Sequence, residues 1–480
     1  METVNKEESY NKRLLCTVCF RGNEPNRKFC SYCWGRLVLA VEVSPDEEHT
    51  IISMVKVALL KNRLVVWGSF TAILLLAVFW AGFSFWNKDP HLGPASTAIS
   101  SSSTLNEWSM QGRDIGRTGY YPGQVSLKGE LAWQFDTDAP LKTTPAVAHN
   151  RAYLATGDGR MVALDASSGN VIWETKLTGP VDSSPAVAGE LLFVGLRDSR
   201  IIALDTETGQ VQWSYDTDNP ISASPLVSKG VVYVGSGDRY MYALDAKTGQ
   251  LRWRYRTMAW QGYSAALGNG IVAFSGADNK TYLTSAHNGA RRLVFRVSKE
   301  TRSGPVIRGN TVLVISPVLI RGGDNGALWA IDLRATQNSQ EVWYRQWWTR
   351  FWFWGLAPAP PSPEGLIWRT TVQGALFHAP AVTEDTVFLG DHLGWLYAMD
   401  LITGEIQWQN NLESQPKSSP VVLGDTIFIS TADYKIRALS VENGEEKWSF
   451  KANARISAPP AAAQGILYVT SEDGTLYALK

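Results

Sequence analysis

All four cysteines of the chain occur near its start, as two Cys-x-x-Cys pairs. Each pair can form a turn that points two thiolates at one metal ion, and two such pairs complete a tetrahedral site. Because four protein ligands leave no open coordination position, we expect one structural Zn²⁺ rather than a catalytic ion. The predicted zinc ligands are Cys16, Cys19, Cys30 and Cys33.

An uncharged apolar stretch of 22 residues follows, from Leu64 to Phe85. As a helix it would be about 33 Å long at about 1.5 Å per residue, and a bilayer core is about 30 Å thick. The stretch therefore predicts a transmembrane helix over residues 64–86. The alternative is a buried core helix.

Basic residues lie before this stretch, at Lys56, Lys61 and Arg63, whereas Lys88 is nearly alone after it. The positive-inside rule then places the N-terminus in the cytoplasm and everything after residue 86 outside, in a single-pass protein of the cell membrane. The reducing cytosol disfavours disulfides, which agrees with a zinc site there. Residues 87–106 are rich in proline, serine and glycine and predict a flexible linker.

Tryptophans recur every 40 residues after this linker, at Trp133, Trp173, Trp213 and Trp253. A proline follows each of the first three after 12 residues, and an aspartate in an Ala-Leu-Asp triplet comes 20 residues after that. The later units keep this frame with substitutions, and we assign their tryptophan places to Phe295, Trp343, Trp408 and Trp448. The frame therefore contains eight units.

Each unit has four short strand signals separated by turn residues, and four is the number of strands in a β-propeller blade. The eighth unit shows only three, and its fourth matches residues 130–136, before the first complete unit. The predicted fold is all-β: an eight-bladed propeller over residues 107–480, with four-stranded blades, closed by that N-terminal strand. Closure would leave no open sheet edge between first and last blades.

Recurring aspartates suit turns. Asp165 and its equivalents precede a glycine turn, and Asp158 and its equivalents stand at hairpin tips. Calcium binding is the alternative for the second set, but one carboxylate on each separate hairpin gives no shared cage. We therefore expect a role in the turns for both sets, in which Asp165 and its equivalents accept backbone N–H bonds.

The segments ALDASSGNVIW, ALDTETGQVQW and ALDAKTGQLRW resemble the repeat of pyrroloquinoline-quinone-type (PQQ-like) propellers. Known members include quinoprotein dehydrogenases and non-catalytic propellers, among them a lipoprotein that assists outer-membrane barrel assembly. Such dehydrogenases hold the quinone under a disulfide of adjacent cysteines, and this chain has no cysteine after Cys33. The resemblance thus implies a propeller without PQQ and without catalysis, with a PQQ-dependent dehydrogenase as the alternative.

The segment KFCSYCWGRL is similar to small zinc ribbons at the N-terminus of bacterial membrane proteins, which implies a zinc ribbon over residues 10–40. The chain departs from that pattern at Thr17 and Phe20, where proline and glycine are usual. The departures alter the first turn but remove no ligand.

One insertion interrupts the repeat between Trp343 and Pro380, where 37 residues replace the usual 12. Dense aromatic loops on a regular scaffold are candidate contact surfaces. The alternatives are that the loop packs on its own ring or dips into the outer leaflet. The predicted partner-binding residues are Trp347, Trp348, Phe351, Trp352, Phe353 and Trp354.

Basic and acidic residues balance at 45 each, which argues against a nucleic-acid partner. The expected function is a membrane-anchored, non-catalytic scaffold that binds envelope proteins, and envelope protein assembly is the process in which we expect it to act. Besides the dehydrogenase, the other alternative is a sensor that relays signals to the cytosolic zinc ribbon.

Overall fold

The computed structural model describes 13–16, 22–24, 27–29, 31, 41–44, 46–54, 95–101, 107–123, 126–299, 301–320, 323–337, 347–348, 350–352, 354–358 and 363–480. The chain forms two compact units, Met1–Lys88 and Asp89–Lys480.

In the first unit, β1 (Arg13–Leu15) pairs with both β2 (Gly22–Asn23) and β3 (Val41–Val43), antiparallel in each case. Helical residues 46–54 follow. A reciprocal cap starts this helix, because the backbone N–H of Ser44 donates to Glu47 (2.9 Å) and the backbone N–H of Glu47 donates to the Ser44 hydroxyl (3.3 Å).

Among the described residues, no helix is long and apolar enough to cross a membrane. The apolar segment predicted to do so, residues 64–86, lies outside those residues.

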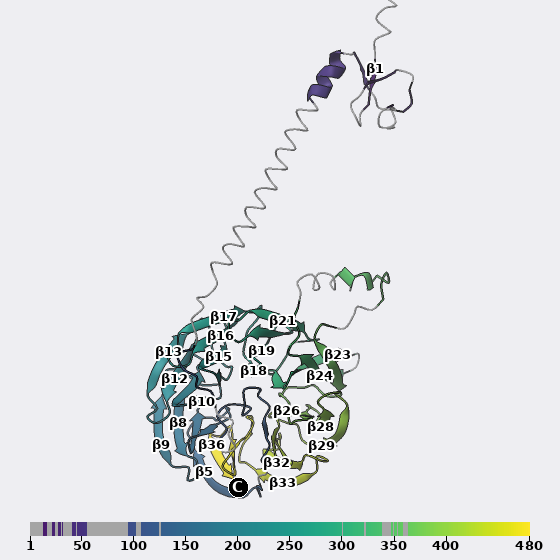
Figure 1. Cartoon of the computed structure of the whole chain (residues 1–480). Coiled ribbons are helices and arrows are strands. Elements are labelled where there is room, and N and C mark those ends of the chain that lie inside the picture. Colours follow the sequence, from purple (N-terminus) through teal and green to yellow (C-terminus); the bar gives the residue numbers. More distant parts are fainter. Residues whose placement is uncertain are drawn as a thin grey trace, which may run out of the picture. The chain divides into compact units, whose positions relative to one another are not determined.

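Eight antiparallel sheets form the second unit and surround a central axis (Figure 1). The first four blades are β6 (Ala146–Ala148), β7 (Arg151–Ala155), β8 (Arg160–Asp165), β9 (Val171–Lys176); β10 (Ala186–Ala188), β11 (Leu191–Gly195), β12 (Arg200–Asp205), β13 (Val211–Asp216); β14 (Leu226–Ser228), β15 (Val231–Gly235), β16 (Tyr240–Asp245), β17 (Leu251–Arg256); and β18 (Ala266–Gly268), β19 (Ile271–Gly276), β20 (Lys280–Ser285), β21 (Arg291–Arg296).

The remaining blades are β22 (Val306–Arg308), β23 (Thr311–Ile320), β24 (Gly323–Asp332), β25 (Leu366–Val372); β26 (Ala381–Val382), β27 (Thr386–Gly390), β28 (Trp395–Asp400), β29 (Ile406–Asn411); β30 (Val421–Leu423), β31 (Thr426–Ser430), β32 (Lys435–Ser440), β33 (Glu446–Lys451); and β34 (Ala461–Ala463), β35 (Ile466–Thr470), β36 (Thr475–Leu479), β5 (Leu131–Asp136). The short strand β4 (Tyr120–Tyr121) adds to the seventh blade.

The order of strands in each blade follows from their side chains. In the first blade the three inner strands are almost wholly buried, whereas the outer strand β9 is mostly exposed. The hydrophobic core lies between neighbouring sheets, where branched and aromatic residues from both faces of the inner strands interlock. Burial thus puts the apolar strands near the axis and the polar strand at the rim.

The repeated tryptophan joins each blade to the next. The indole N–H of Trp173 donates to the carbonyl oxygen of Thr206 (3.0 Å), and its ring covers Gly209. A Cβ atom on Gly209 would lie 2.6 Å from that ring, and the residue has a φ of +71°. Only glycine fits both the turn and the close approach.

Ring closure by the N-terminal strand is confirmed. The strand β5 pairs antiparallel with β36, with Trp133 opposite Ala478 and Asp136 opposite Thr475. The expected all-β propeller with eight four-stranded blades is therefore correct.

Two tryptophan places were assigned wrongly. In the fourth blade Leu293, not Phe295, stands opposite Leu283, the position that Trp173 holds opposite Ala163. In the fifth blade the place belongs to Trp368, whose indole N–H donates to Leu401 O (3.0 Å). The aromatic insertion therefore lies between β24 and β25 of the fifth blade, before the tryptophan and not after it.

Residues 107–121, here called the strap, cross the inner ends of the blades. Backbone hydrogen bonds of 2.7–2.8 Å join the strap to the innermost strands of six blades, through Val147, Val187, Leu267, Ile307, Val382 and Val422. A Cβ atom on Gly116 would lie 2.3 Å from the carbonyl oxygen of Ile307, so the strap has room at that point only for a residue without a side chain.

Candidate functional site

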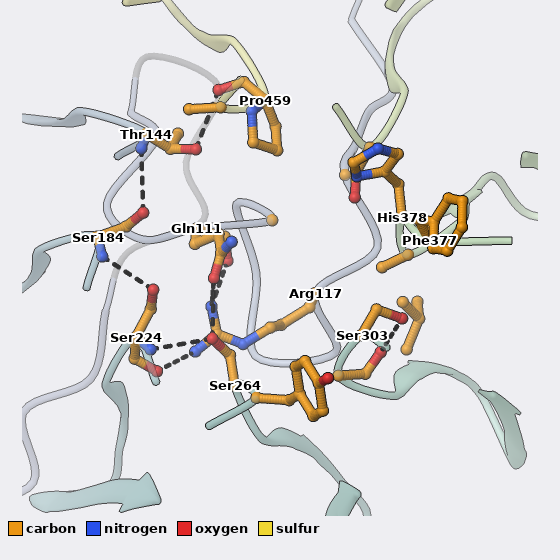
Figure 2. Close-up of a pocket in the computed structure, with 18 of the residues that line it drawn as sticks. Gln111, Arg117, Thr144, Ser184, Ser224, Ser264, Ser303, Phe377, His378 and Pro459 are labelled. Carbon is orange, nitrogen blue, oxygen red and sulfur yellow. Dashed lines mark hydrogen bonds between the residues drawn. The ribbon is translucent and has the colours of Figure 1, made fainter. Parts of the chain in front are cut away.

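The strap closes one end of the central channel and leaves a cavity of about 270 Å³ above it (Figure 2). The walls come from the segment that precedes the innermost strand of each blade, where the repeated proline stands. The eight segments converge there because the blades are arranged around one axis.

A row of hydroxyl groups links successive blades around the cavity. The backbone N–H of Thr144 donates to Ser184 Oγ (3.0 Å), that of Ser184 to Ser224 Oγ (2.9 Å), and that of Ser224 to Ser264 Oγ (3.0 Å). Ser264 in turn donates to Gln111 Oε1 of the strap (2.9 Å). Figure 2 shows these bonds in sequence. They tie four blades to each other, so the hydroxyl groups are already engaged by protein partners.

Arg117 forms the floor of the cavity. Its guanidinium donates to the carbonyl oxygens of Ala265 (2.7 Å), Ser224 (2.8 Å) and Gln111 (2.7 Å). Burial lowers the pKa of Arg117 to about 9, although the nearby charge of Asp114 opposes this shift. The cation is held by backbone carbonyls of two blades and the strap, which is a structural arrangement.

The opposite wall carries His378 and Phe377. Burial, and then the charge of Lys417, lower the pKa of His378 to about 4, so the imidazole is neutral at pH 7. The guanidinium of Arg302 lies 4.9 Å from the centre of the Phe377 ring. No lining residue among those described forms a nucleophile–base pair with His378.

A calcium-bound quinone, which dehydrogenases with this repeat use, does not fit the described lining residues. Such a cofactor needs carboxylate ligands, and Asp182 is the one carboxylate among the described lining residues. An oxygen of that carboxylate lies 3.3 Å from Arg197 Nε. The geometry thus offers hydrogen bonds that hold the ring and strap together, and no cation cage.

The predicted zinc ligands are only partly described. Cys16 is buried directly after β1, and Cys19, Cys30 and Cys33 lie outside the described residues. Within the described part of the chain, no three metal-ligating side chains come together. The zinc prediction therefore stays a prediction.

The predicted contact residues of the insertion are mostly exposed. Trp347 and Phe351 are each 40% exposed, Trp352 49% and Trp354 61%. Phe351 lies 6.3 Å from the ring centres of both Trp347 and Trp354. Phe353 lies outside the described residues, and Trp348 donates its indole N–H to the carbonyl oxygen of Pro358 (3.1 Å).

The turn aspartates behave as expected. Asp165 accepts backbone N–H bonds from Ser167 (3.1 Å) and Ser168 (2.9 Å), and the hydroxyls of these two serines, followed by the backbone bonds, lower its pKa. At a hairpin tip, Asp158 accepts from Thr156 and Arg160 rather than facing another carboxylate.

The strap was missed as an element of the site. Its segment WSMQGRDIGRTG stands before the first unit of the repeat and outside its frame. Two residues of this segment could have indicated a structural role, Gly116 and Arg117. Neither residue type shows in the sequence which distant segment it contacts.

Comparison with known proteins supports the fold. A family model described as outer membrane protein assembly factor BamB matches residues 124–343 and 362–480. Among solved structures, BamB from Moraxella catarrhalis is 18% identical over 73% of this chain and 97% of its own, with a TM-score of 0.57. Quinohemoprotein alcohol dehydrogenase from Comamonas testosteroni is 15% identical over 79% and 81%, with a TM-score of 0.59.

The computationally designed protein Ika8 reaches the same TM-score of 0.59 at 15% identity, over 75% of this chain and 99% of its own. None of the curated proteins matches the chain. At these identities the likeness between structures concerns the fold alone.

Proposed function

The chain belongs to the family of the outer membrane protein assembly factor BamB, and from this we propose that it is a non-catalytic scaffold that binds proteins of the cell envelope. The family match runs over the whole ring except the insertion and the strap. The proposal is that the ring is a rigid platform, and that the parts outside the repeat determine what it binds.

The exposed aromatic insertion of the fifth blade is the observation that carries this proposal. Large aromatic side chains dominate protein contacts because each buries much apolar area at little entropic cost. Phe351 lies beside both Trp347 and Trp354, and Trp347, Phe351 and Trp354 remain 40%, 40% and 61% exposed. We therefore propose the insertion as the protein-binding surface.

The absence of catalysis is part of the same proposal. In the described cavity, the hydroxyl groups of Ser184, Ser224 and Ser264 accept bonds from backbone N–H groups, and none faces a general base. A nucleophile needs a base within hydrogen-bond reach. Incubation with PQQ, calcium and primary alcohols, followed by an assay for dye reduction, tests this point, and turnover would contradict it.

We further propose that the apolar segment 64–86 anchors the protein as a single-pass membrane protein, with the zinc ribbon in the cytoplasm and the propeller outside. The charge pattern around that segment supports this orientation. The propeller would then meet envelope proteins on the extracytoplasmic side.

The test is cross-linking in cells, with the full chain and a variant in which residues 347–358 are replaced by a glycine–serine loop. We expect the variant to keep its thermal transition, because β24 and β25 remain, and to lose its cross-linked envelope proteins. Ile402→Ser is the matched control, since Ile402 is 78% exposed at a turn of the next blade. An unchanged set of cross-linked proteins would contradict the proposal.

A further inference from the structure

The outer strands of the third and fourth blades concentrate positive charge. Together β17 (LRWRYR) and β21 (RRLVFR) contain six arginines and no acidic residue. The other six outer strands hold four basic residues and four acidic ones. In a chain of zero net charge, this sector, here called the arginine rim, is a local positive surface.

Several of these arginines face solvent. Arg254, Arg256, Arg291 and Arg296 are exposed, whereas Arg252 is buried near Asp245. Within the described part of the chain, Arg256, Arg291 and Arg296 form no ion pair with a carboxylate. Their charge is therefore available to an external anion.

The arginine rim also borders a groove of about 710 Å³ that is lined by residues of the third, fourth and fifth blades. Its lining combines Arg256, Arg291 and Arg296 with the apolar side chains of Leu293 and Trp329. Leu293 stands where other blades carry tryptophan. A groove with cations beside apolar floor residues suits an amphiphile with an anionic headgroup.

The polypeptide that leads from the apolar segment docks on this same sector. The backbone N–H of Ser96 donates to Asp245 (2.8 Å) at a turn of the third blade. Gly230 N donates to Ile99 O (2.6 Å), and Lys229 N donates to the hydroxyl of Ser100 (2.7 Å). Residues 95–101, assigned from sequence to a flexible linker, are thus held on the blade that carries half of the rim arginines.

Few residues separate the predicted membrane segment from the docked segment along the chain. Eight residues, 87–94, stand between residue 86 and Ala95. Eight residues span at most about 28 Å when fully extended. If the apolar segment is inserted in a bilayer, the part of the third blade that binds residues 95–101 would therefore lie within that reach of the membrane surface.

We propose that the arginine rim binds the anionic headgroups of the membrane in which the chain is anchored. Of the proposed function, this inference depends on one part only, the membrane anchor at residues 64–86. Two exposed arginines lie on the blade that holds the docked segment and two on the next blade, and clustered arginines near a membrane anchor are the usual chemistry of attraction to an anionic lipid surface. The rim would hold the propeller against the bilayer, and the insertion of the fifth blade would meet protein partners there.

The experiment uses the full chain in nanodiscs of either phosphatidylcholine alone or phosphatidylcholine with phosphatidylglycerol. Hydrogen–deuterium exchange is measured for peptides covering 251–258 and 291–298. We expect slower exchange in the anionic discs only, with the protection lost at about 1 M salt, where the Debye length falls to about 3 Å. Equal exchange in the two kinds of disc would overturn the proposal.

The rim variant replaces Arg254, Arg256, Arg291 and Arg296 by glutamine. Its matched control replaces four lysines of the first and seventh blades by glutamine and so removes the same amount of charge. These lysines are Lys176, Lys435, Lys447 and Lys451. We expect the rim variant to lose protection in anionic discs and the control to keep it. If both variants keep it, the rim does not contact lipid.

A failure of the scaffold proposal is distinguishable. Loss of cross-linked proteins in the insertion variant reports on protein binding, and lipid-dependent protection of the rim reports on the bilayer. Protection that appears only when an acidic protein is added, with no response to lipid charge, would assign the rim to a protein partner and overturn the lipid assignment.

Discussion

The indole N–H of Trp448 donates to the carbonyl oxygen of Leu127 at 2.7 Å, although 321 residues separate them. The same contact elsewhere joins residues only 33 apart, as between Trp173 and Thr206 at 3.0 Å. The backbone of Glu130 meanwhile exchanges two hydrogen bonds with Lys480, of 3.0 and 2.9 Å. The junction between the seventh and eighth blades therefore has the same tryptophan contact as the junction between the first and second.

The two junctions of the eighth blade provide a matched pair of tryptophans. In the described part of the chain, the indole N–H of Trp133 is buried without a hydrogen-bond partner, whereas the carbonyl oxygen of Ala166 at that junction accepts from Tyr468 (2.9 Å). Trp448→Phe and Trp133→Phe remove the same ring volume. We expect Trp448→Phe to lower the free energy of unfolding by about 1 kcal/mol more, the net value of one hydrogen bond. Equal losses in urea titrations would contradict this.

The strap should respond to one methyl group. Gly116→Ala places a Cβ atom 2.3 Å from Ile307 O, so the strap or the fifth blade must shift. We expect a cost of about 1–3 kcal/mol and faster hydrogen exchange over residues 107–121, with little change in the outer strands. Unchanged exchange in Gly116→Ala would show that the strap does not pass as tightly as described.

His378 predicts a pH dependence. Its folded-state pKa of about 4 lies below the ordinary value of about 6.5. The unfolded chain therefore binds the proton first, so the contribution to stability is complete above pH 6.5 and is lost as the pH falls through 4. We expect His378→Gln to show a smaller drop in urea midpoint between pH 7 and pH 5 than the wild type. Identical slopes would exclude this role of the histidine.

The zinc prediction is tested by metal analysis of the full chain. We expect about one zinc per chain, the content of a four-cysteine site, and its loss in Cys16→Ser. The thermal transition of the propeller should stay unchanged, because Cys16 belongs to the first unit. A purified chain without zinc would refute the metal site.

Most of the ring could be predicted from the sequence because its blades repeat at a fixed interval. The misplaced tryptophan shows where that reasoning stops. Trp368 stands 12 residues before Pro380, the same interval as from Trp173 to Pro185, so the correct place could have been read from the sequence. Trp343 competes for that place because it follows Asp332 by 11 residues, close to the 8 that separate Asp165 from Trp173.

The other errors have different causes. In the fourth blade, Phe295 is the aromatic residue nearest to the expected tryptophan place. Strand register, however, puts Leu293 at that place. The strap could not be predicted at all. Its partners, such as Val422, lie up to about 300 residues away, and backbone hydrogen bonds leave no side-chain pattern in either segment.

The pairing of β5 with β36 also concerns how the protein is made. The strand carrying Trp133 leaves the ribosome hundreds of residues before Leu476 and Tyr477, its partners across the sheet. Until then β5 and the exposed edge of the first blade have no neighbour, and such edges favour aggregation. A nascent chain would need a chaperone during that interval. A chain shortened before β36 could not close the ring and would be exposed to proteolysis.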